Sequence, residues 1–191
     1  MEAIEFRLTG VSPGLMVNNP QTVNPFNEYT QRMKEITDRR KRSDDDLRDL
    51  LKLKWRAALY YDDKIGPYLP AICVWRSIHD AAKISRGGKT IERGLHIAQD
   101  RLAIEYDGPR DAEALYASPK FVDVRDASPG GKRVTACRPV FIEWQMTAPF
   151  FYEPSLLNER DLVAAVQTAG KLVGVGTYRQ RFGRFEARVL N

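Results

Sequence analysis

Alternating apolar and polar residues near both ends of the chain constrain its fold more than any other feature. Residues 4 to 8 alternate isoleucine, phenylalanine and leucine with glutamate and arginine, and residues 184 to 190 alternate arginine and glutamate with apolar side chains. A longer alternation covers residues 134 to 148. A period of two is typical of a strand that buries one face, so we expect three such strands.

Helices are expected between these strands. Apolar residues recur at helical spacing over residues 46 to 60, 72 to 82 and 159 to 171. A shorter, highly charged helix is expected over residues 28 to 40. The mixture of strands and helices predicts an α+β protein, and a length of 191 residues suits a single domain over residues 1 to 191.

The charge of the chain favours anionic partners. Thirty Lys and Arg stand against 25 Asp and Glu, which gives a net charge of +5 and a pI near 9.2. The first residues carry no basic leader, and no apolar run is long enough to span a membrane. We therefore expect a cytoplasmic protein with no membrane partner. Cys73 and Cys137 lie in apolar patterns without metal-ligand spacing, so we expect them to be buried and unreactive.

The segment GKLVGVGTYRQRFGRF, at residues 170 to 185, carries the main functional signal. Glycine permits positive φ and leaves backbone N–H groups that can meet phosphate oxygens. Arginine contacts phosphates and bases, and aromatic rings stack on bases. We predict a nucleic-acid site made of Gly174, Gly176, Tyr178, Arg179, Arg181, Phe182 and Arg184. The alternative is a plain connection whose glycines serve turns and whose arginines are solvated.

Two other basic clusters are candidates for extending this surface. One surrounds the end of the helix expected at residues 72 to 82, and the other flanks a glycine turn before the long strand. We predict that both contribute nucleic-acid contacts, through Arg86, Lys89 and Arg93 in the first cluster and Lys132, Arg133 and Arg138 in the second.

Catalytic signals are weak in this sequence. His79 sits beside an apolar stripe and is expected to be structural, whereas His96 is the one candidate general base. Asp62 and Asp63 are adjacent acids of the kind that usually cap helices or aid solubility. The glycine-rich segment lacks the Gly-Lys-Ser/Thr of a phosphate-binding loop. We expect binding without a catalytic residue, metal or cofactor.

Two motifs together resemble a known family. GPYLPAICVWRSIHDAAK, at residues 66 to 83, followed by the glycine-rich segment, is similar to the RAMP superfamily of CRISPR RNA-binding proteins. The matching positions are Tyr68, Pro70, Gly174, Gly176, Arg179, Gly183 and Phe185. Ala71 stands where the family usually has a glycine. The opening LTGVSPGLMVNN also resembles phage and prophage proteins, which would place the chain in the host cytoplasm.

The resemblance implies an RRM-like, or ferredoxin-like, antiparallel sheet backed by two helices. These would be the helices at 71 to 85 and 159 to 171, with a helical insertion at about 20 to 62. Nucleic acid would lie on the sheet face or near the glycine-rich segment. The family also implies side-by-side self-association into an oligomer, with the insertion as one contact.

Four functions remain open at this stage. The first is non-catalytic binding of single-stranded RNA or DNA in phage replication or defence interference. The second is a phage sponge or inhibitor that captures a small anionic nucleotide. The third is a metal-independent ribonuclease that uses His96, and the fourth is a structural phage protein.

Overall fold

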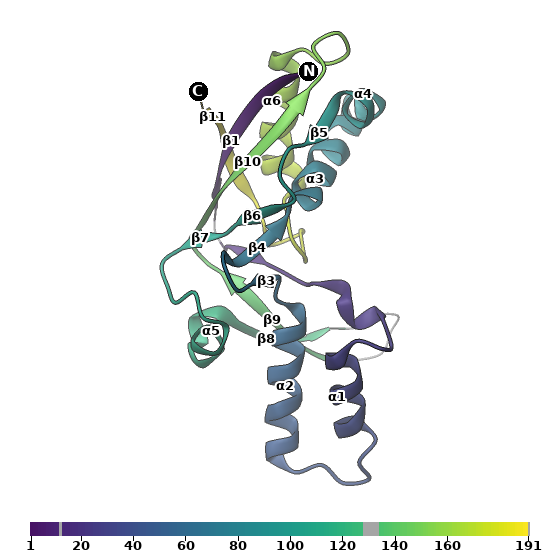
Figure 1. The fold of residues 1–191 in the computed structure, drawn as a ribbon, viewed down its shortest axis with the longest axis vertical. Helices are drawn as coiled ribbons and strands as arrows, with labels where there is room; N and C mark the ends of the chain where they lie inside the picture. The colour runs from purple at the N-terminus through teal and green to yellow at the C-terminus, as the bar shows by residue number, and fades with distance from the viewer. Residues whose placement is uncertain (12, 128–133, 191) are drawn as a thin grey trace.

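A five-stranded antiparallel sheet forms one end of the elongated molecule (Figure 1). The structure is a computed structural model and describes residues 1–11, 13–127 and 134–190. The strand order is β11-β1-β10-β5, with bounds Phe185–Leu190, Glu2–Gly10, Trp144–Tyr152 and Leu95–Ile97. The short strand β7, Glu105–Tyr106, pairs with the far end of β10.

Two helices cover one face of this sheet. Helix α3 spans Ala71–Ile84 and connects β1 with β5, while α6 spans Glu159–Thr168 and connects β10 with β11. Strand β1 buries Ile4, Phe6 and Leu8 on the helix side, as its alternation predicts. The order strand, helix, strand, strand, helix, strand confirms the predicted ferredoxin-like fold.

Residues between these core elements build the other end of the molecule. The stretch between β1 and α3 holds β2 Leu15–Met16, η1 Pro20–Val23, α1 Glu28–Thr37, α2 Asp44–Ala58, β3 Tyr61–Asp62 and β4 Gly66–Pro70. Helix α4, Gly88–Gly94, is an exception: it follows α3 and lies beside α3 and β5, at the end of the molecule that holds the main sheet (Figure 1). The stretch between β5 and β10 holds β6 Arg101–Ala103, β7, α5 Ala112–Ala117, η2 Pro119–Phe121, β8 Val122–Ala127 and β9 Val134–Phe141. Two small sheets form there, β2-β9-β8 and β3-β4-β6.

Helix α2 fixes this second end to the core. Ser43 caps the helix and exchanges hydrogen bonds with Asp46 in a capping box. At the other end, Trp55 is 1% exposed and its Nε1 donates to the carbonyl of Phe121 at 2.9 Å. The buried cluster that contains Trp55 also contains Phe6 of the main sheet, so one apolar core runs through both ends.

Two local predictions are wrong. The alternation over residues 134 to 148 was expected to form one strand, but the chain breaks at Ile142 and Glu143 into β9 and β10, which belong to different sheets. The second concerns GPYLP at residues 66 to 70, whose glycine and prolines predict a rigid turn; this segment is the strand β4, which pairs with β3 and β6. In both places the local sequence does not reveal the result. Pairing with strands that are distant in the sequence decides which residues form a strand and which sheet that strand joins.

Among the described residues, no helix combines the length and the apolar character that crossing a membrane requires.

Candidate nucleic-acid interface

The glycine-rich loop, residues 174 to 184, connects the helical turn η4, Ala169–Val173, with β11. The loop is fastened to β2 and its neighbours, because the N–H of Thr177 donates to Met16 at 2.8 Å and that of Gly183 to Gly14 at 2.7 Å. A Cβ on Gly176 would lie 2.3 Å from the Met16 carbonyl oxygen. Glycine is therefore required at Gly176 by the crossing of two backbones.

The backbone N–H groups of the loop are only partly available to a ligand. The N–H of Gly174 donates to Ala169 at 2.7 Å, so the predicted free donor at this position is absent. The N–H groups of Gly176, Tyr178 and Arg179 have no acceptor among the described residues. Tyr178 also has a positive φ of 54°, which bends the backbone at the centre of these donors.

The two aromatic residues of the loop differ in exposure. Tyr178 is 48% exposed, whereas Phe182 is 4% exposed and packs with Met16. Arg125 of β8 places its guanidinium 5.3 Å from the Tyr178 ring and 5.1 Å from the Phe182 ring, while also pairing with Asp123. Tyr178 keeps an exposed face for stacking; Phe182, which was predicted to stack, is instead part of the core.

A hollow of about 480 Å³ lies where the loop meets α3 and α4. We call it the α3 hollow. Its size is within the range of small-molecule and nucleotide sites. Its lining joins residues that are about a hundred positions apart in the sequence: Cys73, Trp75, Arg76, His79, Asp80, Glu92, Gly176 and Arg179.

Aromatic side chains of α3 contribute to one wall of the α3 hollow. The rings of Trp75 and His79 stack with centroids 5.2 Å apart and an interplanar angle of 16°. The indole Nε1 of Trp75 donates to the carbonyl of Leu95 at 2.9 Å, which fixes the ring. Both residues are half-buried, so they contribute to the surface that a ligand would meet.

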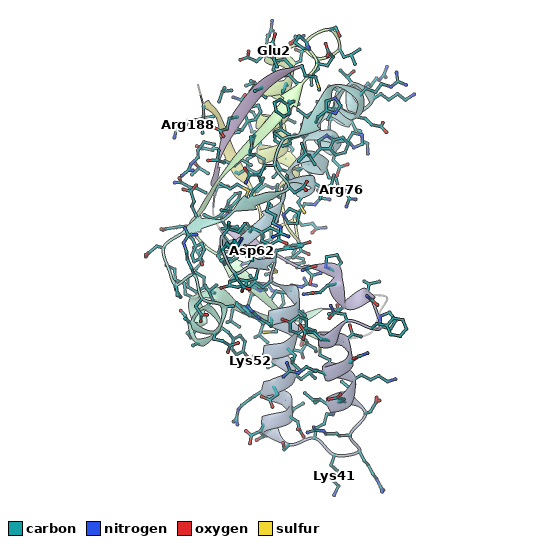
Figure 2. The ribbon with its side chains drawn as sticks, in the orientation of Figure 1. Glu2, Lys41, Lys52, Asp62, Arg76 and Arg188 are labelled. Carbon is teal, nitrogen blue, oxygen red and sulfur yellow. The ribbon has the colours of Figure 1, made fainter. Side chains whose placement is uncertain are left out.

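Two arginines supply positive charge at the α3 hollow. Arg179 pairs with Asp80 at 3.5 Å, and Lys83 shares the same carboxyl group at 3.3 Å. Arg76 has no carboxylate partner in the part of the chain that the structure describes, and it projects from α3 in Figure 2. Burial raises the pKa of the neighbouring Cys73 thiol, so the thiol stays neutral near pH 7 and adds no negative charge.

The other basic residues that were predicted to contact nucleic acid lie in different parts of the molecule. Arg181 is exposed on the loop, whereas Arg184 is half-buried and its Nη1 atom has no hydrogen-bond partner among the described residues. Arg86, Lys89 and Arg93 are exposed at the α3–α4 corner, and α4 also supplies Glu92 to the hollow. Arg138 lies on β9 opposite Asp123. Lys132 and Arg133 lie outside the described residues.

The uncovered face of the main sheet is a second surface near the site. Its exposed aromatic residue is Phe151 on β10, at 41%, and His96 on β5 lies directly beside it. Arg7 is paired with Glu105: its guanidinium donates hydrogen bonds to both carboxylate oxygens of Glu105, each at 2.5 Å. In the described ranges, no cluster of three His, Cys, Asp or Glu side chains is arranged to hold a metal ion.

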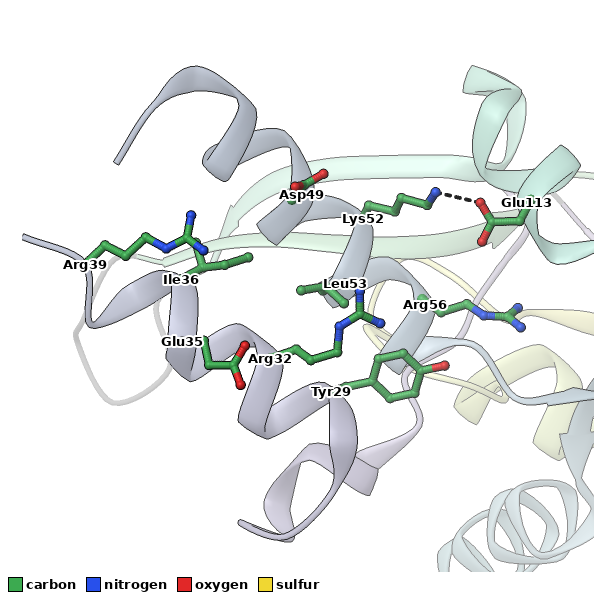
Figure 3. A pocket seen from close by; sticks show the side chains of 10 residues that line it. All are labelled: Tyr29, Arg32, Glu35, Ile36, Arg39, Asp49, Lys52, Leu53, Arg56 and Glu113. Atoms are coloured by element: carbon green, nitrogen blue, oxygen red, sulfur yellow. Dashed lines mark ion pairs between the residues drawn. The ribbon is translucent and has the colours of Figure 1, made fainter. Parts of the chain in front are cut away.

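A further hollow, of about 430 Å³, lies in the helical insertion between α1 and α2 (Figure 3). Figure 3 shows Arg32 and Glu35 reaching in from α1, and Glu113 pairing with Lys52 at 2.6 Å. Four basic side chains line it beside three acidic ones. Charge does not distinguish this hollow from the α3 hollow, where Arg76 and Arg179 stand beside Asp80 and Glu92. We place the interface at the α3 hollow because the glycine-rich loop and the stacked rings of Trp75 and His79 meet there.

Comparison with known proteins gives one kind of match. No protein-family model matches the sequence, and no curated protein matches it. A solved structure does match: a chain in the cryo-EM structure of the Type III-B Cmr-beta complex bound to cognate target RNA, with 12% identity and a TM-score of 0.52. The match covers 98% of this chain and 59% of the length of the chain in that structure, and at this identity it shows the fold alone.

Sequence reasoning missed most of the α3 side of the site. Arg76 and Asp80 carry no signal of a site in the sequence, and Trp75 falls within the apolar helical pattern of residues 72 to 82, which predicts a place in the core for it. The signal available in the sequence is spacing: His79 and Asp80 stand three and four positions after Arg76, which places the three side chains on one side of a helix. The contact with Arg179 depends on tertiary packing, which spacing along the chain does not reveal.

Proposed function

We propose that this chain binds single-stranded nucleic acid without cleaving it, with RNA as the first candidate. The observation that carries the proposal is the α3 hollow, which is lined by Arg76, Arg179 and Trp75. The exposed Tyr178 directly precedes Arg179 in the glycine-rich loop. Positive charge next to aromatic faces is the combination that binds single strands, through phosphate contacts and base stacking.

The structural likeness supports RNA over DNA as the first ligand to test. The matched chain belongs to a complex bound to target RNA. In our proposal, the strand enters at Tyr178, places phosphates beside Arg179 and Arg76, and continues toward Lys89 at the α3–α4 corner. The uncovered sheet face with Phe151 would hold bases further along the strand. A single domain, phage origin and self-association stay predictions.

The test is fluorescence anisotropy of labelled single-stranded RNA and DNA at several salt concentrations. We expect affinity to fall steeply between about 50 and 200 mM salt, as phosphate contacts predict. The variant Arg76→Ala/Arg179→Ala removes two contacts and should reduce the salt slope by about 1.4. The matched control is Arg48→Ala/Arg160→Ala, which removes the same charge at exposed positions outside the hollow and should leave the slope nearly unchanged.

A competition experiment distinguishes binding of a nucleic-acid strand from binding of a small nucleotide. The α3 hollow is large enough for one nucleotide, which is the observation that favours the sponge function. If a mononucleotide displaces the labelled strand at low concentration, the sponge function replaces our proposal. Binding that grows with strand length and resists mononucleotides supports it, and no binding at low salt contradicts it.

A further inference from the structure

Strand β11 forms an edge of the main sheet. It pairs with β1 on one side, and no described strand pairs with it on the other (Figure 1). An edge strand presents unpaired backbone groups that can bond to another chain. The arginines of the proposed nucleic-acid site lie on α3 and the glycine-rich loop and not on β11, which belongs to the same sheet as Phe151.

The hydrogen-bond pattern identifies which groups of β11 face outward. The N–H of Val11 donates to the carbonyl of Arg184 at 2.9 Å, so these two residues form a hydrogen-bonded pair. Because such pairs alternate along an antiparallel ladder, Glu186 and Arg188 turn their backbone groups toward β1. Residues 185, 187 and 189 therefore turn theirs toward the open edge.

One end of the edge is closed by the chain itself. A Cβ on Gly170 would lie 2.0 Å from the carbonyl oxygen of Phe185, so η4 covers that oxygen. This contact agrees with the outward direction of the Phe185 carbonyl. The open part of the edge is centred on Ala187, whose N–H and carbonyl both point away from β1.

The side chains of β11 are self-complementary in charge. Glu186 and Arg188 are exposed on the face away from the helices, and neither forms an ion pair with another described residue. They stand two positions apart, on either side of Ala187. An antiparallel copy of the strand paired at Ala187 would therefore place each acid against a base.

We propose that two copies of this chain associate through β11, in antiparallel register about a two-fold axis at Ala187. The two Ala187 residues exchange N–H···O bonds, which the free groups permit. Glu186 then faces Arg188 of the second copy at non-hydrogen-bonded positions, where side chains lie closest. The two-fold axis repeats the same contact, giving two ion pairs and one continuous sheet.

Neighbouring registers are disfavoured by charge. A shift by one step in either direction places Glu186 against Glu186 or Arg188 against Arg188, and like charges directly opposite each other are destabilising. An edge that only repels other chains would carry charges of one sign along this face. The alternation of sign therefore favours pairing with a second copy of the same strand.

The test is sedimentation velocity of the full chain from about 1 μM to about 1 mM, which covers weak and moderate affinities. We expect a concentration-dependent dimer in the wild type. The single reversals Glu186→Arg and Arg188→Glu should each weaken the dimer at least tenfold, since each places like charges opposite each other. The double reversal restores opposite charges and should restore the dimer.

A variant that removes a backbone hydrogen-bond donor provides an independent test. Ala187→Pro removes the outward N–H but no hydrogen bond to β1, so it should abolish the dimer while circular dichroism and the melting temperature of the monomer stay close to wild type. A monomer at all concentrations, a dimer that survives both single reversals, or a double reversal that stays monomeric would overturn the proposal. RNA affinity of these variants, measured in parallel, separates this result from the nucleic-acid proposal.

Discussion

Replacing Gly176 with alanine should destabilise the fold rather than act on a ligand. Gly176 has a φ of +77°, and its absent Cβ would lie 2.3 Å from the Met16 carbonyl oxygen. The left-handed backbone costs an alanine about 1–2 kcal/mol. Moving the loop away from Met16 also breaks the hydrogen bond from Thr177, which contributes about 1 kcal/mol.

The sum is a loss of about 2–3 kcal/mol in the free energy of unfolding. For a chain of this length, about 2–4 °C of melting temperature corresponds to each kcal/mol, so we expect a decrease of about 4–12 °C. Urea denaturation followed by tryptophan fluorescence measures the free energy, and thermal circular dichroism measures the melting temperature.

Gly87 supplies the matched control. It has a φ of −86°, and the nearest atom to an added Cβ is 3.5 Å away, so Gly87→Ala should change stability by less than about 0.5 kcal/mol. If Gly176→Ala keeps wild-type stability but loses RNA binding, the glycine serves the ligand and our explanation of this position is wrong.

Three further variants probe the site and the core. Asp80→Asn removes the carboxylate beside Arg179 and should strengthen binding of single-stranded RNA by about two- to fivefold in anisotropy titrations; weaker binding would contradict the role given to Arg179. Trp55→Phe leaves the carbonyl of Phe121 unpaired and should cost about 1–3 kcal/mol in urea denaturation, whereas no change would contradict the importance of this hydrogen bond. Burial raises the pKa of the Cys137 thiol from its ordinary 9.0 to about 11, so the unfolded state ionises first and stability should fall as pH rises from about 9 to 11. Urea midpoints across this range should fall less in Cys137→Ala, and equal slopes would exclude the thiol as the cause.

The core of the fold could be predicted because each of its elements buries one face. Apolar and polar residues alternate in β1 and β11, and apolar residues recur at helical spacing in α3 and α6. Both patterns follow from that burial and are visible in the local sequence. The break between β9 and β10 could not be predicted, since the alternation continues through Ile142, which is 47% exposed at the break. Only the pairing of the two segments with different sheets reveals it.

The candidate site could be predicted in part. Glycines and arginines in the loop indicated a special backbone, and the structure confirms positive φ at Gly174 and Gly176. The reason for these glycines was not visible, because the contact of Gly176 with Met16 joins residues far apart in the chain. The approach of Arg179 to Asp80 is hidden for the same reason.

Photocrosslinking of single-stranded RNA, followed by mass spectrometry of the crosslinked peptides, tests the central claim most directly. Ultraviolet light joins stacked bases to aromatic side chains that they touch, so it locates the strand without relying on a variant. We predict crosslinks at Trp75, which lines the α3 hollow, and at the exposed Tyr178, which precedes Arg179 in the loop; both should disappear at high salt. Crosslinks confined to Phe151 on the sheet face, or an absence of crosslinks at salt concentrations where binding is measured, would contradict the account.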